Sequence, residues 1–533
     1  MADEARGKEF YRTLSKFLSD EELKEVKSLL RKNDVEEKLD VKYRDWIKKQ
    51  DFRTEPCDGD QDEESHYKEK IAAIFEKLLE FAEPVILDEH GWDKEEMMTY
   101  HAQAFTVMKI CQLLCTVFKD AKQMEPQSRL TQTDKKYVLR KSACCLVSLC
   151  AANVEGHPWT DEQSKTTAHE LLALICSYCH CSSISDLLCG CVEVNLSETS
   201  AKDNPEDSRQ TFNTLFPSGL FKHILDYLKP YLLKDTWKKS PLARHVLVWC
   251  TLGLKHPFVG DHFPKLMSPL LLFIDDYEVE NKVLGLKCLK HVVDNMNSAE
   301  LQWYGRADVL FEATQRHLYT SEACLVRVLH PCLLSILKVL EPPPTKPKFG
   351  RKTTKCDSVF QIMLTSMEFE GKIAMRRACA SQLRDYIEHM GITILRHFKR
   401  LLRVIVSYLE VSDYPEEEAR LAILDALNTA ILYAWPRIPQ HSSMILKSLL
   451  KLLVDTTDSA PYLTTQAYQQ LKEKTAECFL LLVRCCGKPF KDQLQELSKG
   501  VGHSEVEECA ANALKDYESE MTDSITCQVA DVT

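Results

Sequence analysis

Glycine is scarce in this sequence: 16 of 533 residues are glycine, about 3% against a usual content of about 7%. Tight turns, phosphate-binding loops and Rossmann crossovers all need glycine, because only glycine allows the required backbone conformations and close approaches. The shortage therefore argues against a doubly wound α/β fold.

Long apolar runs are also missing. Uninterrupted ones such as 270–274 and 479–483 are far shorter than the roughly 18 residues that would span a bilayer. The first ten residues are charged and contain no apolar signal-peptide region. We therefore expect no membrane contact and an intracellular protein, located in the cytoplasm and also in the nucleus.

The motifs of common enzymes are absent as well. The sequence has no G-x-x-x-x-G-K loop, no G-x-S-x-G elbow, no H-E-x-x-H helix and no kinase H-R-D and D-F-G pair. Its net charge of -11 argues against general nucleic-acid binding, which depends on Lys and Arg neutralising phosphates. We expect no enzyme activity, no catalytic residues, no cofactor and no nucleic-acid partner.

Helical periodicity is what the sequence has in abundance. Apolar residues recur at three- and four-residue spacing, and a short break containing Pro, Asp, Ser or Gly follows each such stretch. Prolines such as Pro264 and Pro415 are expected between helices, because proline ends a helix. The stretches that predict helices are 71–81, 97–118, 137–151, 166–181, 220–232 and 242–254.

The clearest repeat unit covers 263–296. It predicts a helix, a break at Asp275, Asp276 and Tyr277, and a second helix whose apolar residues share one face. Gly285 and Cys288 are small enough to let a neighbouring helix approach. A second unit of the same plan begins near residue 392, and its break again contains Asp-Tyr. Such pairs bury their apolar faces only against neighbouring pairs, which predicts an all-α, HEAT-like helical-repeat α-solenoid.

Breaks in the pattern divide the chain. We expect loops at 53–66, 197–209 and 341–357 and a tail from 521, of which the first loop and the tail are expected to be mobile. The predicted parts are an N-terminal helical segment (1–52), an N-terminal helical-repeat block (67–196), a central HEAT-like block (210–340), a C-terminal HEAT-like block (358–520) and the mobile tail (521–533).

Cysteines are numerous, 22 in all, and most lie within apolar helical stretches, which is typical of reduced core residues. One group has zinc-like spacing: Cys176-x-x-Cys179-His180-Cys181, followed by Cys189-x-Cys191. Structural zinc sites use turns rich in glycine and aromatic residues, whereas 171–181 has a helical pattern. We therefore predict core packing and no metal, with zinc binding as the alternative.

Two basic groups allow two interpretations. Arg396, Lys399, Arg400 and Arg403 lie on one side of a predicted helix, and the loop 341–357 contains Lys346, Lys348, Arg351, Lys352 and Lys355. They could bind nucleic acid or an acidic protein. No aromatic residues are interleaved with them, which favours a solvated helix face and a solubilising linker.

Three stretches closely resemble one known family. IDDYEVENKVLGLKCLKHVVDNM, then YGRADVLFEATQRHLYTSE, then GITILRHFKRLLRVIVSYLEVSDYPEEEARLAILDALNTAILYAWPR are similar, in order and spacing, to the Tel-two-interacting protein two family. The likeness covers about 263–484. It implies a helical-repeat solenoid without catalytic residues, and a subunit of the Triple T complex with Tel-two and Tel-two-interacting protein one.

The resemblance also implies a cochaperone role. The Triple T complex is an adaptor that hands new phosphatidylinositol-kinase-like protein kinases, including those of the DNA damage response, to the ninety-kilodalton heat-shock chaperone machinery, so that the kinases mature and persist. Two alternatives stay open: a HEAT-repeat transport or trafficking adaptor, and a nucleic-acid-binding HEAT protein, which would need a continuous basic groove.

Candidate protein-binding residues lie at the repeat breaks, where we expect them to be exposed. The alternative is that they only cap helices and orient repeats. The candidates are Asp275, Asp276, Tyr277, Glu280 and Asn281 at the first break, Tyr408, Glu410, Asp413 and Tyr414 at the second, and the basic residues Arg396, Lys399 and Arg400.

Overall fold

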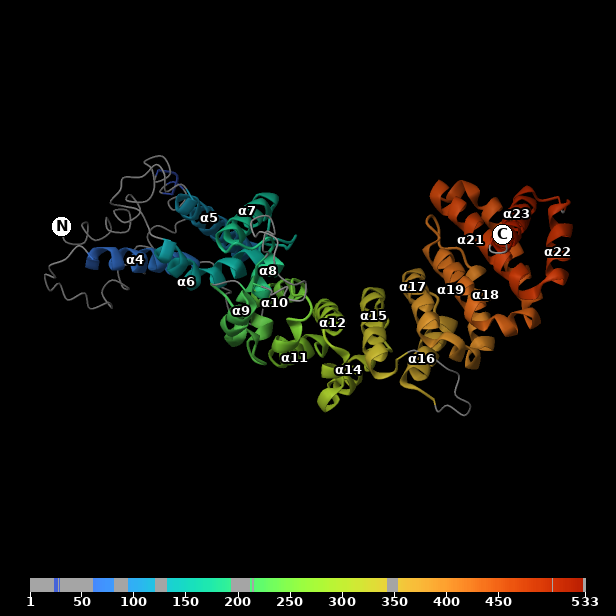
Figure 1. The fold of residues 1–533 in the computed structure, drawn as a ribbon, viewed down its shortest axis with the longest axis horizontal. Coiled ribbons are helices and arrows are strands. Elements are labelled where there is room, and N and C mark those ends of the chain that lie inside the picture. The colour runs from blue at the N-terminus through green and yellow to red at the C-terminus, as the bar shows by residue number, and fades with distance from the viewer. Residues whose placement is uncertain are drawn as a thin grey trace. The chain divides into compact units, whose positions relative to one another are not determined.

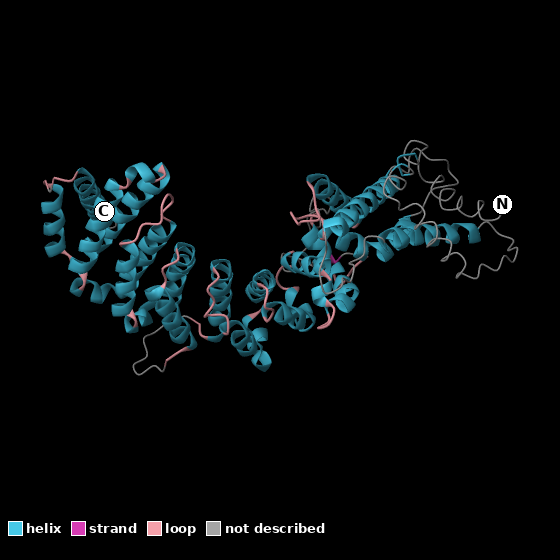
Figure 2. Cartoon of the chain, turned by 180° about the vertical axis from the view of Figure 1, so that it is seen from behind, coloured by secondary structure: helices cyan, strands magenta, loops and turns pink. Residues whose placement is uncertain are grey.

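A computed structural model describes residues 24–26, 28, 61–80, 94–119, 132–192, 211–212, 215–342, 353–500 and 502–530. Helices dominate these residues (Figure 2). The strands in this part of the chain are two residues long each, β1 (Cys191–Val192) and β2 (Thr211–Phe212), and they pair antiparallel. The prediction of an all-α, helical-repeat fold is confirmed.

Contacts between backbone positions divide the chain into two compact units, Met1–Pro269 and Leu270–Thr533. The boundary lies inside helix α11 and inside the central block predicted from the sequence, so the predicted blocks stay predictions. The first unit contains α4 (Gln61–Glu80), α5 (Lys94–Lys119), α6 (Gln132–Ala151), α7 (Glu162–Tyr178), α8 (Ile184–Cys189), α9 (Leu220–Leu228), η2 (Lys229–Leu232), η3 (Trp237–Lys239), α10 (Pro241–Leu252) and most of α11 (Val259–Ile274).

The second unit contains the helices that carry the candidate site. They are α12 (Val279–Asp294), α13 (Ser298–Gln302), η4 (Trp303–Gly305), α14 (Arg306–Gln315), α15 (Ala323–Leu340), α16 (Lys355–Phe369), α17 (Ile373–Met390), η5 (Gly391–Arg396), α18 (Phe398–Leu409), α19 (Glu418–Ala434), η6 (Trp435–Gln440), α20 (Ser442–Asp458), η7 (Ala460–Tyr462), α21 (Thr465–Cys486), α22 (Lys488–Ser498) and α23 (Ser504–Ala530).

Helix pairs build the second unit. α14 packs on α15, α16 on α17, α18 on α19 and α20 on α21, and the second helices α12, α15, α17, α19 and α21 pack side by side in that order (Figure 1). Their apolar residues are buried between pairs, as with Leu289, Leu333, Leu383 and Leu427. This nearest-neighbour packing is the HEAT-type arrangement that the sequence predicts.

Gly285 of α12 faces the last residues of α11. A Cβ atom there would lie 2.9 Å from Cγ1 of Ile274 and 3.0 Å from Cβ of Phe273, which is closer than real Cβ contacts. Cys288, one turn further on, is fully buried. The prediction that these two small residues admit a neighbouring helix is confirmed for Gly285.

Helix α15 is apolar enough, by length and composition, to cross a membrane. In the structure 61% of this helix is buried within the protein, and it packs between α12 and α17. Both observations are typical of the core helix of a repeat stack.

Several predicted boundaries are wrong. Pro264 lies inside α11 rather than before it, because the buried side chains of Phe263 and Leu266 hold the helix despite the lost hydrogen bond. α4 begins at Gln61, within the predicted first loop, and α16 begins at Lys355, before the predicted third loop ends. α23 continues to Ala530, through most of the predicted mobile tail, because 504–530 contains no Pro or Gly to end a helix.

Other predicted parts lie outside the described residues. They are the loop 197–209, the segments 53–60 and 343–352 of two further loops, residues 531–533, and nearly all of the segment 1–52.

Candidate protein-binding turns

The turns before α12, α15, α17, α19 and α21 share one feature: an exposed aromatic side chain lies in each turn or at its first residue. The exposed fractions are 76% for Tyr277, 79% for Tyr319, 84% for Phe369, 45% for Tyr414 and 70% for Tyr462. Each precedes the first residue of α12, α15, α17, α19 or α21 by two to four residues. We call these five residues, with the exposed charged residues of their turns, the aromatic edge.

These helices pack side by side, and we infer from the repeat plan that their N-terminal ends lie in a row. Contacts between turns support this arrangement. The rings of Tyr414 and Tyr462 are 6.1 Å apart, and the backbone N–H of Thr464 donates to the carbonyl oxygen of Pro415 at 3.1 Å. Nη2 of Arg327 in α15 lies 3.2 Å from Oε2 of Glu418 at the start of α19.

The first predicted site, at the α11–α12 turn, is only partly exposed. Asp275, Tyr277 and Glu280 are exposed, as expected. Asp276 and Asn281 are buried, which contradicts the expectation, because Nδ2 of Asn281 donates to Oδ2 of Asp276 at 2.6 Å. The two residues therefore fix the shape of the turn.

The second predicted site, at the α18–α19 turn, divides in the same way. Glu410 and Tyr414 are exposed, whereas Asp413 and Tyr408 are buried, which contradicts the expectation of exposure. Tyr408 lies in the face of α18 that packs inward, and the guanidinium of Arg376 stacks 3.7 Å from its ring centre. Burial raises the pKa of the Tyr408 hydroxyl.

Glu417 sets the backbone of this turn. It adopts a left-handed conformation with φ of 51° and is completely buried, where it accepts hydrogen bonds from the Ser412 hydroxyl and from the backbone N–H of Asp413. Burial raises the pKa of the Glu417 carboxyl. These contacts explain why α19 begins at Glu418 and why Tyr414 is held outward.

The basic residues of η5 and α18 do not form an independent cluster. Arg400 makes a two-point contact with Glu368 of α16, from Nε to Oε1 at 2.9 Å and from Nη2 to Oε2 at 2.6 Å, which lowers the pKa of that carboxyl. Nη1 of Arg396 lies 3.1 Å from Oδ2 of Asp357. Lys399 and Arg403 are exposed. Arg396 thus ties η5 to α16, and Arg400 ties α18 to α16.

The other basic group falls largely outside the described residues, which include only its last member. Lys355 is the first residue of α16 and forms an ion pair with Asp308 of α14. Lys346, Lys348, Arg351 and Lys352 are not among the described residues.

The cysteine group lies at the end of α7 and in the short helix α8. Cys176, Cys179, Cys181 and Cys189 are all buried. Burial raises the pKa of Cys176 and of Cys179 to about 12, which disfavours the thiolate form that zinc binds. Among the residues whose side chains are described, no three His, Cys, Asp or Glu residues are arranged to hold a metal ion.

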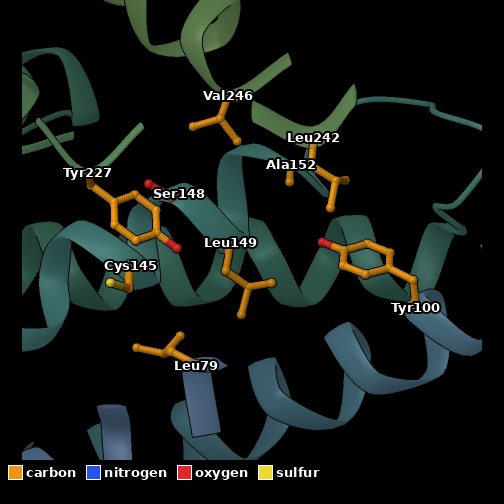
Figure 3. Close-up of a pocket in the computed structure, with 9 residues that line it drawn as sticks. All are labelled: Leu79, Tyr100, Cys145, Ser148, Leu149, Ala152, Tyr227, Leu242 and Val246. Carbon is orange, nitrogen blue, oxygen red and sulfur yellow. The ribbon is translucent and has the colours of Figure 1, made fainter. Parts of the chain in front are cut away.

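Two pockets lie among the described residues of the first unit. The one in Figure 3 lies between α4, α5, α6, α9 and α10 and has a volume of about 10 Å³, which is room for roughly one water molecule. The Ser148 hydroxyl faces it and has no hydrogen-bond partner. A larger, open pocket of about 400 Å³ is lined by Lys222, Asp261, His262 and Lys265 among others, but Lys265 is engaged by Asp226 at 2.6 Å.

The described fold and its exposed turns define a helical-repeat protein of the HEAT-like, all-α class. The model of the Tti2 family matches residues 145–416. TELO2-interacting protein 2 of Rattus norvegicus is 37% identical over 353 residues, 66% of this chain and 65% of the relative. The protein of the same name from Homo sapiens is 37% identical over 342 residues, 64% of this chain and 63% of the relative. The chain belongs to the Tti2 family.

The chain thus matches about 65% of the length of these relatives. Among solved structures, karyopherin Kap121p bound to the SUMO protease Ulp1p aligns with a TM-score of 0.42 at 12% identity, over 80% of this chain and 43% of Kap121p. A Kap95:Nup1 complex aligns with a TM-score of 0.45 at 14% identity, over 84% of this chain and 53% of that chain. Scores this low carry no inference about function.

Proposed function

We propose that this protein is a non-enzymatic scaffold subunit of a Triple T complex, which binds Tel-two (TELO2) and Tel-two-interacting protein one. Membership of the Tti2 family carries the proposal, since the relatives are named for their interaction with TELO2. In this role the protein acts as a cochaperone adaptor. It supports the maturation and stability of phosphatidylinositol-kinase-like kinases through the ninety-kilodalton heat-shock chaperone, in the cytoplasm and nucleus.

Two physical effects support this role: a large contact area with the partners, and stabilisation of the bound partners by mass action. A stable interface needs about 800 Å² from each partner, and a row of adjacent repeats supplies a surface of that order. A subunit that binds folded partners also stabilises them, whereas partners left alone expose apolar interface and are degraded.

Depletion followed by rescue tests the proposal. Loss of this protein should lower the amounts of its two partner subunits and of several of the kinases, without comparable loss of their messenger RNAs. Rescue by the unaltered chain should restore them. Normal kinase levels in depleted cells, or failure of the tagged protein to co-purify with Tel-two and Tel-two-interacting protein one, would contradict it.

A further inference from the structure

The distribution of exposed aromatic residues in the second unit is not even. Nine aromatic side chains are exposed among its described residues, and five of them are the residues of the aromatic edge. The other four are Trp303, Tyr304, Tyr433 and Trp435. A single exposed aromatic residue needs no explanation, but a series at equivalent positions of five consecutive repeats marks an interaction surface.

The charge of these turns is acidic. Among the described residues of 275–280, 316–322, 369–372, 414–416 and 458–464, the exposed carboxylates outnumber the exposed cations six to two. The carboxylates are Asp275, Glu278, Glu280, Glu322, Glu416 and Asp458, and the cations are Arg316 and Lys372. A surface of this sign repels nucleic acid and attracts a basic protein segment.

We propose that the aromatic edge binds an extended, basic segment of a protein partner. The inference rests on the proposed function, because it names the surface through which the scaffold holds its partner. Lys and Arg side chains of the segment stack on the exposed rings and pair with the neighbouring carboxylates. Tyrosine suits such a surface, because it gives a large contact area at a low cost in conformational entropy.

The spacing of the helices sets the length of the segment. Packed helices lie about 8–10 Å apart, so five N-terminal ends in a row span roughly 32–40 Å. An extended chain advances about 3.3 Å per residue, so about 10–12 residues cover the edge. Neighbouring turns are then about three residues apart along the segment.

A purely structural role does not account for these side chains. The residues that shape the turns, such as Asp276, Asn281 and Asp413, are buried, whereas the aromatic residues face outward. Tyr414 and Tyr462 cover each other in part, the Tyr414 hydroxyl lies 2.7 Å from the Ser459 hydroxyl, and the Tyr277 hydroxyl donates to Glu278 at 3.0 Å. Phe369, in contrast, is 84% exposed and carries no polar group that could cap a helix.

Binding of the full-length chain to the co-purified pair of Tel-two and Tel-two-interacting protein one tests the proposal. One variant carries Tyr319→Ser, Phe369→Ser and Tyr462→Ser. Its control carries Val309→Ser, Leu432→Ser and Trp435→Ser, which lie outside the edge and are 47%, 58% and 60% exposed. A second variant carries Asp275→Lys, Glu322→Lys and Asp458→Lys, and its control carries Glu300→Lys, Asp385→Lys and Asp492→Lys, also exposed.

Both edge variants should bind the pair at least about tenfold more weakly, and both controls within about twofold of the unaltered chain. The unaltered complex should weaken with added salt. A carbodiimide, which joins carboxylates to lysines, should link Asp275, Glu416 and Asp458 to lysines within a single stretch of about a dozen partner residues. Circular dichroism checks that every variant folds.

The outcomes separate this inference from the proposed function. If the unaltered chain binds the pair and the edge variants bind as well as their controls, the inference is wrong and the scaffold role stands. Cross-links from the edge to scattered or acidic regions of the partners would also overturn it. If the unaltered chain does not bind the pair, the proposed function fails, and the inference fails with it.

Discussion

Arg377 and Asp413 join two neighbouring repeats: Nε of Arg377, in α17, donates to Oδ2 of Asp413, before α19, at 2.6 Å. The same carboxylate oxygen accepts from the backbone N–H of Ala419 at 3.0 Å. Asp413 is 3% exposed, and a second nitrogen of Arg377 donates to its backbone carbonyl. One side chain therefore caps α19 and ties it to α17.

Replacement of this carboxylate should destabilise the second unit. Asp413→Ala removes one partner of the part-buried Arg377 guanidinium, which keeps Glu418 at 3.7 Å, and it also removes the cap of α19, so we expect a loss of about 2 kcal/mol in the free energy of unfolding. Asp413→Asn keeps one acceptor and should lose less. Chemical denaturation measures both. A loss below about 0.5 kcal/mol for Asp413→Ala would contradict the structural role of the pair.

Leu289 gives a second prediction, in the packed face of α12. The side chain is 1% exposed, so Leu289→Asp buries a lone carboxylate and should cost several kcal/mol. Lys287→Asp, on the exposed face of the same helix, is the matched control and should change stability by about 0.5 kcal/mol or less. In the rescue experiment Leu289→Asp should mimic loss of the protein. Equal stability of the two variants would show that α12 does not pack as described.

The helical repeats could be predicted from the sequence, because the spacing of apolar residues and the breaks between helices depend only on residues near one another in the chain. Leu286, Leu289 and Val293 are buried on one face of α12, as their spacing predicts. Two turns of the aromatic edge were also found from the sequence, through the shared Asp-Tyr of the breaks at Tyr277 and Tyr414. Tyr319, Phe369 and Tyr462 could not be found in this way, because their turns lack the Asp-Tyr pair. The feature that all five turns share is an exposed aromatic residue before the second helix, and exposure is known only from the structure.

Burial at the turns could not be predicted from the sequence. Asp276 and Asp413 have the residue type of an exposed turn, yet each is buried by one partner: Asn281, five residues along the chain, or Arg377, 36 residues away. Neither partner is recognisable from spacing. Likewise, Arg396 and Arg400 resemble a basic cluster in the sequence. In the structure α16 places Asp357 next to Arg396 and Glu368 next to Arg400.

Gly285→Ala should lower stability although alanine favours helices. The substitution gains about 0.5–1 kcal/mol in helix propensity, but its methyl group meets Ile274 and Phe273 of α11 at 2.9 and 3.0 Å, and such overpacking costs about 1–3 kcal/mol. We expect a net loss of about 1 kcal/mol. Gly371→Ala, where an added Cβ meets nothing within 4 Å, is the control and should be neutral or stabilising. A gain at both positions in thermal denaturation would contradict the close approach of α11 and α12.

His330 predicts how stability depends on pH. The side chain is 4% exposed in α15, its Nδ1 lies 3.2 Å from the hydroxyl of Tyr386, and burial lowers its pKa from 6.5 to about 4. Between pH 6.5 and 4 the unfolded chain therefore binds a proton that the folded chain does not, so stability falls as the pH falls through this window. The contribution of this one group is about 3 kcal/mol over the window and is constant above it.

Replacing the group should remove its share of the pH dependence. His330→Gln should flatten the fall in the free energy of unfolding between pH 6.5 and 4 by up to about 3 kcal/mol, as measured by urea denaturation at several pH values. Burial lowers the pKa of His245 to about 3, so His245 still contributes to the pH dependence of the free energy of unfolding in the variant. His223→Gln, at an exposed position, is the matched control and should leave the slope unchanged. If His330→Gln and His223→Gln give the same slope as the unaltered chain, His330 titrates in the folded protein as it does in the unfolded one, and its burial in the packed α15–α17 layer is not maintained in solution.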